Sequence, residues 1–185
     1  MIIKKIIFCF LSFLGLSSPL IALAEIYNNP ATKIEFQNEI AGLRQVKITN
    51  FEETTPGLGV SVGYNGEKDK LTVYIYNLGL SSIVDSQDDE LIKKHFKQTF
   101  SDVLKLHPAV NIKNITNSNN QATARWYIAN FEYEENSVEV NSYLLLTTYK
   151  NNFLKFRYTF PLADEGTGKE ILKDILKYFI PQISK

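Results

Sequence analysis

The residues best suited to acid–base or metal chemistry are two histidines, His95 and His107, which are twelve positions apart. On a single helix this spacing places them about 120° apart around the axis, so a shared metal ion would need ligands from other elements. No His-Glu-x-x-His pair is present. His95 falls on an apolar stripe, where a half-buried side chain is expected, and His107 suits a helix end that favours positive charge. Either imidazole could also act as a general base.

A glycine-rich stretch, Gly57-Leu-Gly-Val-Ser-Val-Gly63, has the composition of a phosphate-binding loop. Such a loop must open a helix whose first amides face the phosphate. Here the glycines alternate with Val60 and Val62, which is the period of a strand. The stretch therefore indicates a glycine-faced strand with another element packed closely against it, and we predict no cofactor.

Two acidic clusters have structural explanations. The first lacks the alternating ligands of a calcium loop and suits the start of a helix; it consists of Asp85, Asp88, Asp89 and Glu90. The second fits a solvated turn at a strand end; it consists of Glu132, Glu134 and Glu135. Gly59-Val-Ser-Val-Gly63 has the form Gly-x-Ser-x-Gly, but it has the period of a strand and not the strand-to-helix turn of a nucleophile elbow, and Ser-x-x-Lys does not occur. Serine hydrolase chemistry therefore has no recognisable nucleophile. We assign no catalytic residue and no metal ligand.

The chain contains 10 tyrosines, and many of them sit opposite the aliphatic residues of the expected strands. In a sheet with one solvent-exposed face, polar and apolar residues would alternate more regularly along the strands. Both faces are therefore expected to be at least partly covered. The simpler interpretation is that helices cover both faces. The functional interpretation is a groove for a peptide, lipid or glycan, lined by Tyr74, Tyr76, Arg125, Tyr127, Tyr143 and Tyr149.

Hydrophobic periodicity predicts the elements that must position these residues. Period-2 alternation and turn residues predict strands over residues 45–51, 58–64, 71–76, 109–116, 121–134, 137–149 and 153–160. A helical stripe with an acidic start predicts a helix over 86–107, stopped by Pro108. The sequence Thr167-Gly-Lys-Glu170 has the form of a capping box for a last helix that Pro181 should end. The fold class is α+β, a mostly antiparallel six- or seven-stranded sheet with two main helices, in the order β-β-β-α-β-β-β-β-α.

This order resembles the PsbP-like fold of extrinsic photosystem proteins and of bacterial exported proteins of the DcrB type. The resemblance rests on the central helix from Asp88 to Leu106 between two groups of strands. It also rests on the ending Phe153-Leu-Lys-Phe-Arg-Tyr-Thr-Phe-Pro161, which leads through Asp164-Glu165 into the closing helix. It covers about residues 45–180 as a pattern, without a motif from which functional residues can be transferred. It implies an accessory or binding role rather than catalysis.

The N-terminus predicts export. Lys4 and Lys5 precede an apolar run from Ile6 to Leu16, too short to span a membrane, and Ala22-Leu-Ala24 supplies the small residues that signal peptidase accepts. We place the cut between Ala24 and Glu25. The expected divisions are a signal peptide at 1–24, a leader and irregular segment at 25–44, and a single α+β domain at 45–185.

The processed chain is expected to be periplasmic or secreted, without a transmembrane anchor. Its 161 residues would carry 18 basic against 20 acidic side chains and would contain no cysteine, since Cys9 lies in the signal peptide. Scattered charges and a net charge of about −2 argue against a nucleic-acid partner, and the lack of cysteine excludes disulfides and thiol chemistry.

We therefore expect a non-catalytic exported accessory or binding protein with an unidentified protein or small-molecule ligand. The alternatives are a secreted enzyme whose site is assembled from scattered residues and a secreted factor acting on a partner protein. A histidine in contact with a carboxylate would favour the enzyme, and a tyrosine-lined concavity without that contact would favour the binding protein.

Overall fold

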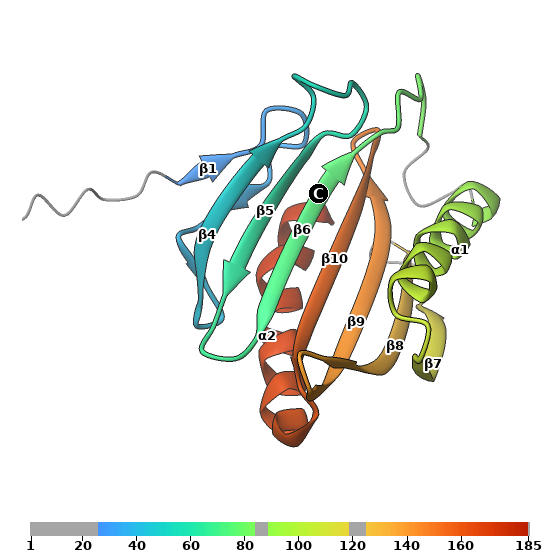
Figure 1. Ribbon diagram of the computed structural model, residues 1–185. Coiled ribbons are helices and arrows are strands. Elements are labelled where there is room, and N and C mark those ends of the chain that lie inside the picture. The colour runs from blue at the N-terminus through green and yellow to red at the C-terminus, as the bar shows by residue number, and fades with distance from the viewer. Residues whose placement is uncertain (1–25, 84–88, 119–124, 185) are drawn as a thin grey trace, which may run out of the picture.

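The fold is α+β, in the predicted order (Figure 1). The computed structural model describes residues 26–83, 89–118 and 125–184. Its helices are α1 (Asp89–Leu106) and α2 (Glu165–Ile183), preceded by the 3₁₀ turn η1 (Leu162–Asp164). Its strands are β1 (Tyr27–Asn28), β2 (Glu35–Phe36), β3 (Glu39–Ile40), β4 (Leu43–Asn50), β5 (Val60–Asn65), β6 (Lys70–Tyr76), β7 (Asn111–Ser118), β8 (Trp126–Glu135), β9 (Val138–Tyr149) and β10 (Asn152–Pro161).

The main sheet is antiparallel throughout, with the strand order β3-β4-β5-β6-β10-β9-β8-β7. The seven expected strands are all present, and the two-residue β3 adds an eighth at one edge. The strands β1 and β2 form a separate two-stranded sheet. Because β10 pairs with β6 as well as with β9, the last strand lies in the middle of the sheet.

Two tight turns set the register of the central hairpins. Asn136 and Ser137 join β8 to β9 with positive φ of 51° and 64°, and Lys150 and Asn151 join β9 to β10 with 45° and 60°. Positive φ at both central residues is the type I′ geometry, whose twist matches that of the flanking strands. The long strands β8, β9 and β10 are therefore locked in place as consecutive neighbours.

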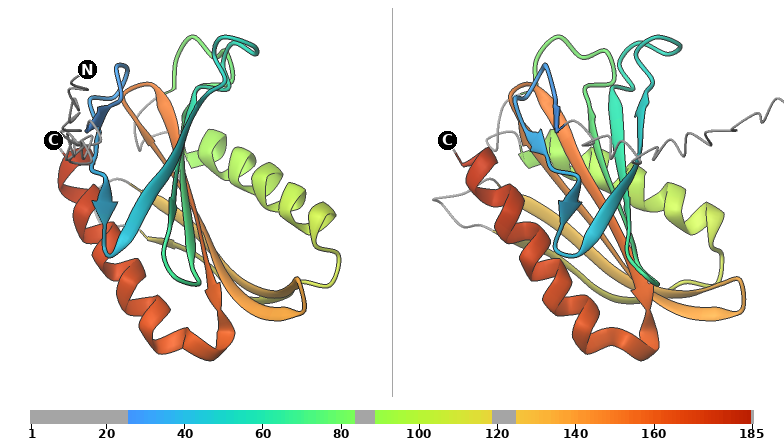
Figure 2. Two further views of the ribbon diagram at one scale, coloured as in Figure 1. Left: turned by 60° about the vertical axis from the view of Figure 1, so that its left-hand side comes forward. Right: turned by 90° about the vertical axis from the view of Figure 1, so that its left-hand side faces the viewer.

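The two helices pack on opposite faces of the sheet (Figure 2). Helix α2 covers the face that carries the even-numbered residues of β10, and Ile175 and Phe179 pack there against Phe156. Residues 34–44, expected to be irregular or a short strand, contain the short strands β2 and β3 and contribute Ile34, Phe36, Ile40 and Leu43 to the same core. Helix α1 packs on β8 and β9, where Phe96 and Phe100 meet Tyr127 and Phe131.

The start and end of α2 differ from the prediction. The helix begins at Glu165, directly after η1, and its N-cap residue Asp164 makes no side-chain capping bond, so Thr167 and Glu170 lie within the helix and form no capping box. Gly168 is needed instead for packing, since a Cβ there would overlap the ring of Phe160. Pro181 lies inside the helix, which continues to Ile183, because a proline so near the C-terminal end interrupts only the last turn.

Candidate functional site

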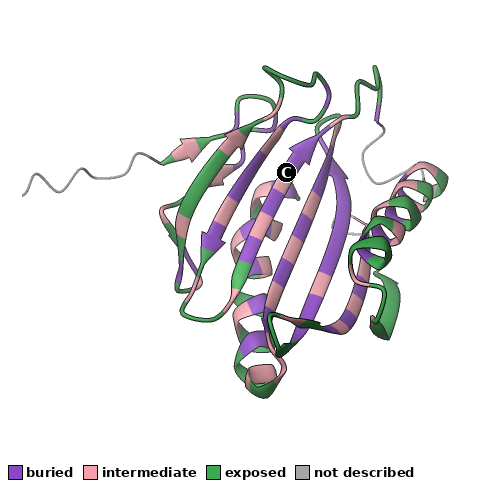
Figure 3. Ribbon diagram, in the orientation of Figure 1, coloured by how far each residue is buried: buried purple, intermediate pink, exposed green. Residues whose placement is uncertain are grey.

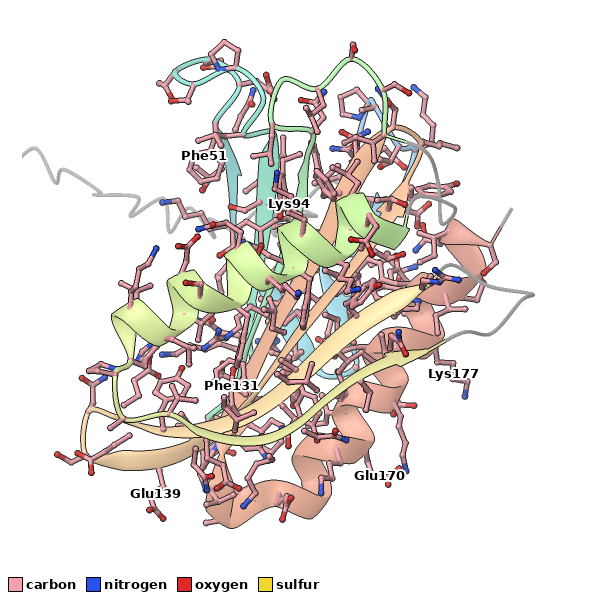
Figure 4. All side chains as sticks on the ribbon, turned by 90° about the vertical axis from the view of Figure 1, so that its right-hand side faces the viewer. Phe51, Lys94, Phe131, Glu139, Glu170 and Lys177 are labelled. Atoms are coloured by element: carbon pink, nitrogen blue, oxygen red, sulfur yellow. The ribbon has the colours of Figure 1, made fainter. Side chains whose placement is uncertain are left out.

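Helix α1 leaves part of its sheet face uncovered, and a cleft of about 600 Å³ lies there. Its floor is built from β6 and β10, its wall from α1 between His95 and Leu106, and its ends from β8 and the loops after β4 and β6. Burial largely alternates between buried and intermediate residues along β6 and β10 (Figure 3). The intermediate residues that line the cleft are Thr72, Tyr74, Lys155, Arg157 and Thr159. Figure 4 shows the same face from the side of α1, with Phe51 near one end and Phe131 beneath the helix.

The register between β6 and β10 places two cations on the floor of the cleft. Tyr74 lies opposite Lys155, and Thr72 lies opposite Arg157. The Nζ atom of Lys155 is 4.0 Å from the centre of the Tyr74 ring and 5.6 Å from that of Tyr76. A lysine ammonium at this distance from an aromatic face is attracted by the ring quadrupole.

Arg157 occupies the corresponding position further along β10. Its guanidinium carbon is 4.5 Å from the centre of the Phe131 ring and 5.7 Å from that of Tyr133, and Nη2 donates to the Tyr133 hydroxyl at 3.3 Å. Among the described residues, neither Lys155 nor Arg157 forms an ion pair with a carboxylate. Lys155 and Arg157 thus have aromatic neighbours and no ion-pair partner among the described residues.

The environment of Lys155 disfavours its charge. Burial is the main cause that lowers the pKa of its amine from 10.5 to about 8, and repulsion from Arg157 adds to it, while Asp102 acts in the opposite direction. A desolvated cation with a like charge beside it is held at an energetic cost, which an anion bound in the cleft would relieve.

The histidines of the sequence prediction both line the cleft, and neither forms a hydrogen bond or ion pair with a carboxylate among the described residues. His95 Nε2 lies 2.7 Å from the Tyr76 hydroxyl, and its ring packs on Phe153 at 4.2 Å. Burial, followed by repulsion from Lys155, lowers the His95 pKa to about 4, so the imidazole is neutral at physiological pH. His107 packs on Tyr133 in a tilted arrangement with ring centres 3.9 Å apart, and burial lowers the His107 pKa as well.

The carboxylates that line the cleft are paired with lysines other than Lys155. Asp102 pairs with Lys105 at 2.9 Å, and its hydrogen bond to Lys105 is the main cause that lowers its pKa. Glu135 pairs with Lys70 at 3.4 Å. The described residues hold no cluster of three or more histidine, cysteine or acidic side chains that could bind a metal ion. The arrangement is suited to binding an anion rather than to proton transfer between a histidine and an acid.

The structure separates the six residues of the predicted groove. Tyr74 and Tyr76 line the cleft, whereas Tyr127 lies on the same sheet face but is buried against Phe96. Tyr143 and Tyr149 pack into the core on the α2 face. Arg125 lies just before β8, where its carbonyl accepts a hydrogen bond from Thr147 Oγ1 at 2.7 Å, and it does not line the cleft.

The sequence prediction missed the residues that give the cleft its charge, Lys155 and Arg157, and the aromatic Tyr133. The available signal was two long cations two positions apart in a strand that is otherwise mostly aromatic. The signal peptidase residues Ala22, Ala24 and Glu25 lie outside the described residues, as do Asp85 and Asp88.

The glycine-rich stretch has a structural role. Gly57 and Gly59 have positive φ, and a Cβ at Gly59 would overlap the carbonyl of Ile75, so the backbone approaches β6 closely. The carboxylate of Glu52 accepts the amide N–H of Gly57 at 3.0 Å and that of Gly59 at 2.7 Å. The amides that a phosphate loop would offer are thus occupied by a side chain of the same loop.

Comparison with known proteins shows the fold. No family model matches the chain, and no curated protein matches it in sequence. Solved structures do match, among them the solution structure of cyanobacterial PsbP (CyanoP) from Synechocystis sp. PCC 6803, with a TM-score of 0.52 and 14% identity over 89% of this chain and 96% of that one. PA94, a protein of unknown function from Pseudomonas aeruginosa, matches with a TM-score of 0.45 and 12% identity over 83% and 93%. The match to the CyanoP structure confirms the predicted PsbP-like fold.

Proposed function

We propose that this chain is an exported, non-catalytic binding protein whose cleft beside α1 holds a small organic anion with an aromatic or apolar body. The observation that carries the proposal is the pair of cations on β10: Lys155 and Arg157 lie on the cleft floor without a carboxylate partner among the described residues. Buried charges in proteins are normally paired with an opposite charge. Two cations that face a cleft without such a partner are therefore suited to binding the negative charge of a ligand.

The other lining residues support an amphipathic ligand. Tyr74 and Tyr76 offer ring faces beside Lys155, and the loops at one end add apolar side chains, Phe51, Leu58 and Leu78. A volume of about 600 Å³ falls in the range of about 300–1,000 Å³ that small-molecule sites occupy. An anionic group placed at the cations would thus have an apolar path alongside it for the rest of the molecule.

The contacts of the histidines favour binding over catalysis. A general base is usually oriented by a second polar group, most often a carboxylate. His95 is hydrogen-bonded to the Tyr76 hydroxyl and packs on Phe153, and His107 packs on Tyr133, so no described carboxylate orients either imidazole. The cleft is a tyrosine-lined concavity without a histidine–carboxylate contact among the described residues, which is the arrangement expected of a binding protein.

Export rests on the sequence: the lysines, the short apolar run and Ala22-Leu-Ala24. Neither helix described in the structure is long and apolar enough to cross a membrane. Native mass spectrometry of protein purified from the periplasm after expression of the full precursor tests the proposal. A measured mass equal to that of a chain starting at Glu25 supports export, and a mass that includes residues 1–24 contradicts it.

Ligand binding is tested with two fluorescent probes of similar shape. One is 1-anilinonaphthalene-8-sulfonate, which is anionic and aromatic, and the other is N-phenyl-1-naphthylamine, which lacks the sulfonate. We expect the anion to bind more tightly, and Lys155→Met and Arg157→Gln each to weaken it about tenfold, since a hydrogen bond to a charged group contributes about 1.5–3 kcal/mol. The neutral probe should be little affected.

The matched control is Lys177→Met on the exposed side of α2. It removes one positive charge far from the cleft and should leave both affinities unchanged. Equal binding of the two probes to the wild-type protein would contradict the proposal. So would a loss of anion affinity in the Lys177 variant as large as that in the Lys155 variant.

A further inference from the structure

A second surface, independent of the cleft, lies along the outer edge of the sheet. β7 pairs with β8 on one side, and on its other side it pairs with no strand of the described chain. Residues 111–117 are all exposed. An edge strand of this length presents a row of unpaired backbone N–H and C=O groups, to which another extended segment can add.

A bulge in β7 brings two isoleucines onto the same face. The register shifts between Ile112 and Asn114, so Ile112 lies opposite Phe131 and Ile115 lies opposite Ala129. Phe131 and Ala129 both belong to the α1-side core, and residues paired across two strands point to the same face. Ile112 and Ile115 therefore both face the α1 side, where they are 46% and 51% exposed.

A groove of about 550 Å³ runs between this edge and α1. Its apolar surface comes from Phe96, Phe100 and Tyr127, which are otherwise buried, together with Ile115. A strand added to the edge of β7 would point every second side chain into this groove.

The helical wall of the groove is cationic. Lys93 and Lys97 line it, and Lys94 is exposed beside them on the same helix turn. Lys93 pairs with Glu90 at 3.2 Å, whereas Lys94 and Lys97 form no ion pair with any described carboxylate. An occupant therefore gains most if it brings a negative charge to the groove as well as apolar side chains.

We propose that an extended segment of a partner protein adds as a further strand along β7, with an acidic side chain and an apolar side chain on its groove-facing side. Backbone bonds to β7 hold the segment, Ile115 and Phe100 contact its apolar residue, and Lys97 contacts its carboxylate. A second copy of this chain fits less well, because pairing β7 with β7 would bring two sets of these lysines towards one interface.

The probe is a fluorescently labelled peptide, acetyl-Thr-Val-Thr-Glu-Thr-Val-Thr-amide, whose valines and glutamate fall on one face of a strand. We expect binding by anisotropy, together with slower amide hydrogen exchange in residues 111–117. Lys97→Glu should weaken binding about fivefold, as expected for reversal of one exposed ion pair. A peptide with lysine in place of glutamate should prefer the Lys97→Glu variant over the wild type, a reversal that loss of folding cannot produce.

Ile115→Asn keeps the exposed strand but removes an apolar contact and should also weaken binding. Lys177→Glu on α2 reverses a charge away from the groove and serves as the control. The proposal is overturned if the peptide does not bind at about 1 mM, which corresponds to about 4 kcal/mol, or if Lys177→Glu weakens it as much as Lys97→Glu. A dimer that Ile115→Asn abolishes would also overturn it, since the occupant would then be a second copy.

Discussion

Replacing Lys155 by methionine should stabilise the protein while it weakens anion binding. Burial and Arg157 lower the pKa of the Lys155 amine from 10.5 to about 8. At about 1.4 kcal/mol per pKa unit, holding this cation in the folded protein costs about 3 kcal/mol at neutral pH. Loss of the contact with the Tyr74 ring, 4.0 Å away, returns about 0.5–1 kcal/mol of that. Methionine keeps the packing on the ring, so the net gain in the free energy of unfolding should be about 2 kcal/mol.

The gain should depend on pH in a defined direction. Below about pH 8, Lys155 is protonated in both the folded and the unfolded chain, so its full cost is present. Between about pH 8 and 10.5 the unfolded chain binds a proton that the folded chain has released, and the stability of the wild type rises with pH. The difference between variant and wild type should therefore be largest below pH 8 and vanish above pH 10.5.

Urea denaturation at pH 7 and pH 10 measures this difference in the free energy of unfolding, and thermal unfolding at pH 7 provides a second measurement. At pH 7 the melting temperature of Lys155→Met should rise by about 4–8 °C, since 1 kcal/mol shifts a domain of this size by about 2–4 °C. Lys177→Met is the control, because Lys177 is exposed on α2, on the opposite face of the sheet from Lys155. A Lys155→Met protein that is less stable than the wild type at pH 7, or equally stabilised at all pH values, would refute the reasoning.

Three further predictions concern α2 and His95. Gly168→Ala should destabilise the protein by about 1–3 kcal/mol, because the added Cβ would overlap the ring of Phe160. Gly166→Ala on the same helix has open space around it and should stabilise the protein by about 0.5–1 kcal/mol. Urea midpoints of the two variants test both expectations. Thr167→Ala should leave the urea midpoint nearly unchanged, since Thr167 forms no cap. A loss of about 1 kcal/mol in the free energy of unfolding would instead support the capping-box prediction. Because the folded-state pKa of His95 is about 4, stability should fall as the pH drops from about 6.5 to 4, and His95→Gln should flatten that part of the profile; an equally steep profile in the variant would assign the fall to other groups.

Much of the fold could be predicted because most of its helices and strands have regular hydrophobic patterns in the local sequence. Period-2 runs gave the seven longer strands, and the stripe from Ile92 to Val103 gave α1. The two-residue strand β3 has no period that could reveal it. The capping box at Thr167 failed because the helix grows directly out of η1, and a local motif does not reveal what precedes it in space.

The candidate site was harder to predict because it depends on which strands are neighbours. Lys155 lies in the cleft only because β10 pairs with β6, a contact between segments about eighty residues apart. The tyrosines illustrate the same limit. Parity along each strand correctly separated one face from the other, but it did not say that Tyr74 and Tyr143 belong to opposite faces of one sheet.

The cleft follows from the width of the sheet. Eight strands at about 4.8 Å spacing span about 34 Å, whereas a helix about 10 Å wide covers about two of them. On the α2 face, the segment that carries Phe36 and Ile40 extends the cover beyond the helix. On the other face α1 covers β8 and β9 and leaves β6 and β10 open.

Exposure alone does not explain the side chains on that open strip. Neutral polar side chains such as Thr72 and Thr159, which lie beside the two cations, would be sufficient on a solvent-exposed surface. Lys155 instead carries a charge that burial and Arg157 disfavour, Asp102 offsets only part of that cost, and no described carboxylate forms an ion pair with it. A costly feature that folding does not require is expected where a protein binds something, which makes Lys155→Met informative: a variant that is more stable and binds less would assign the charge to function rather than to the fold.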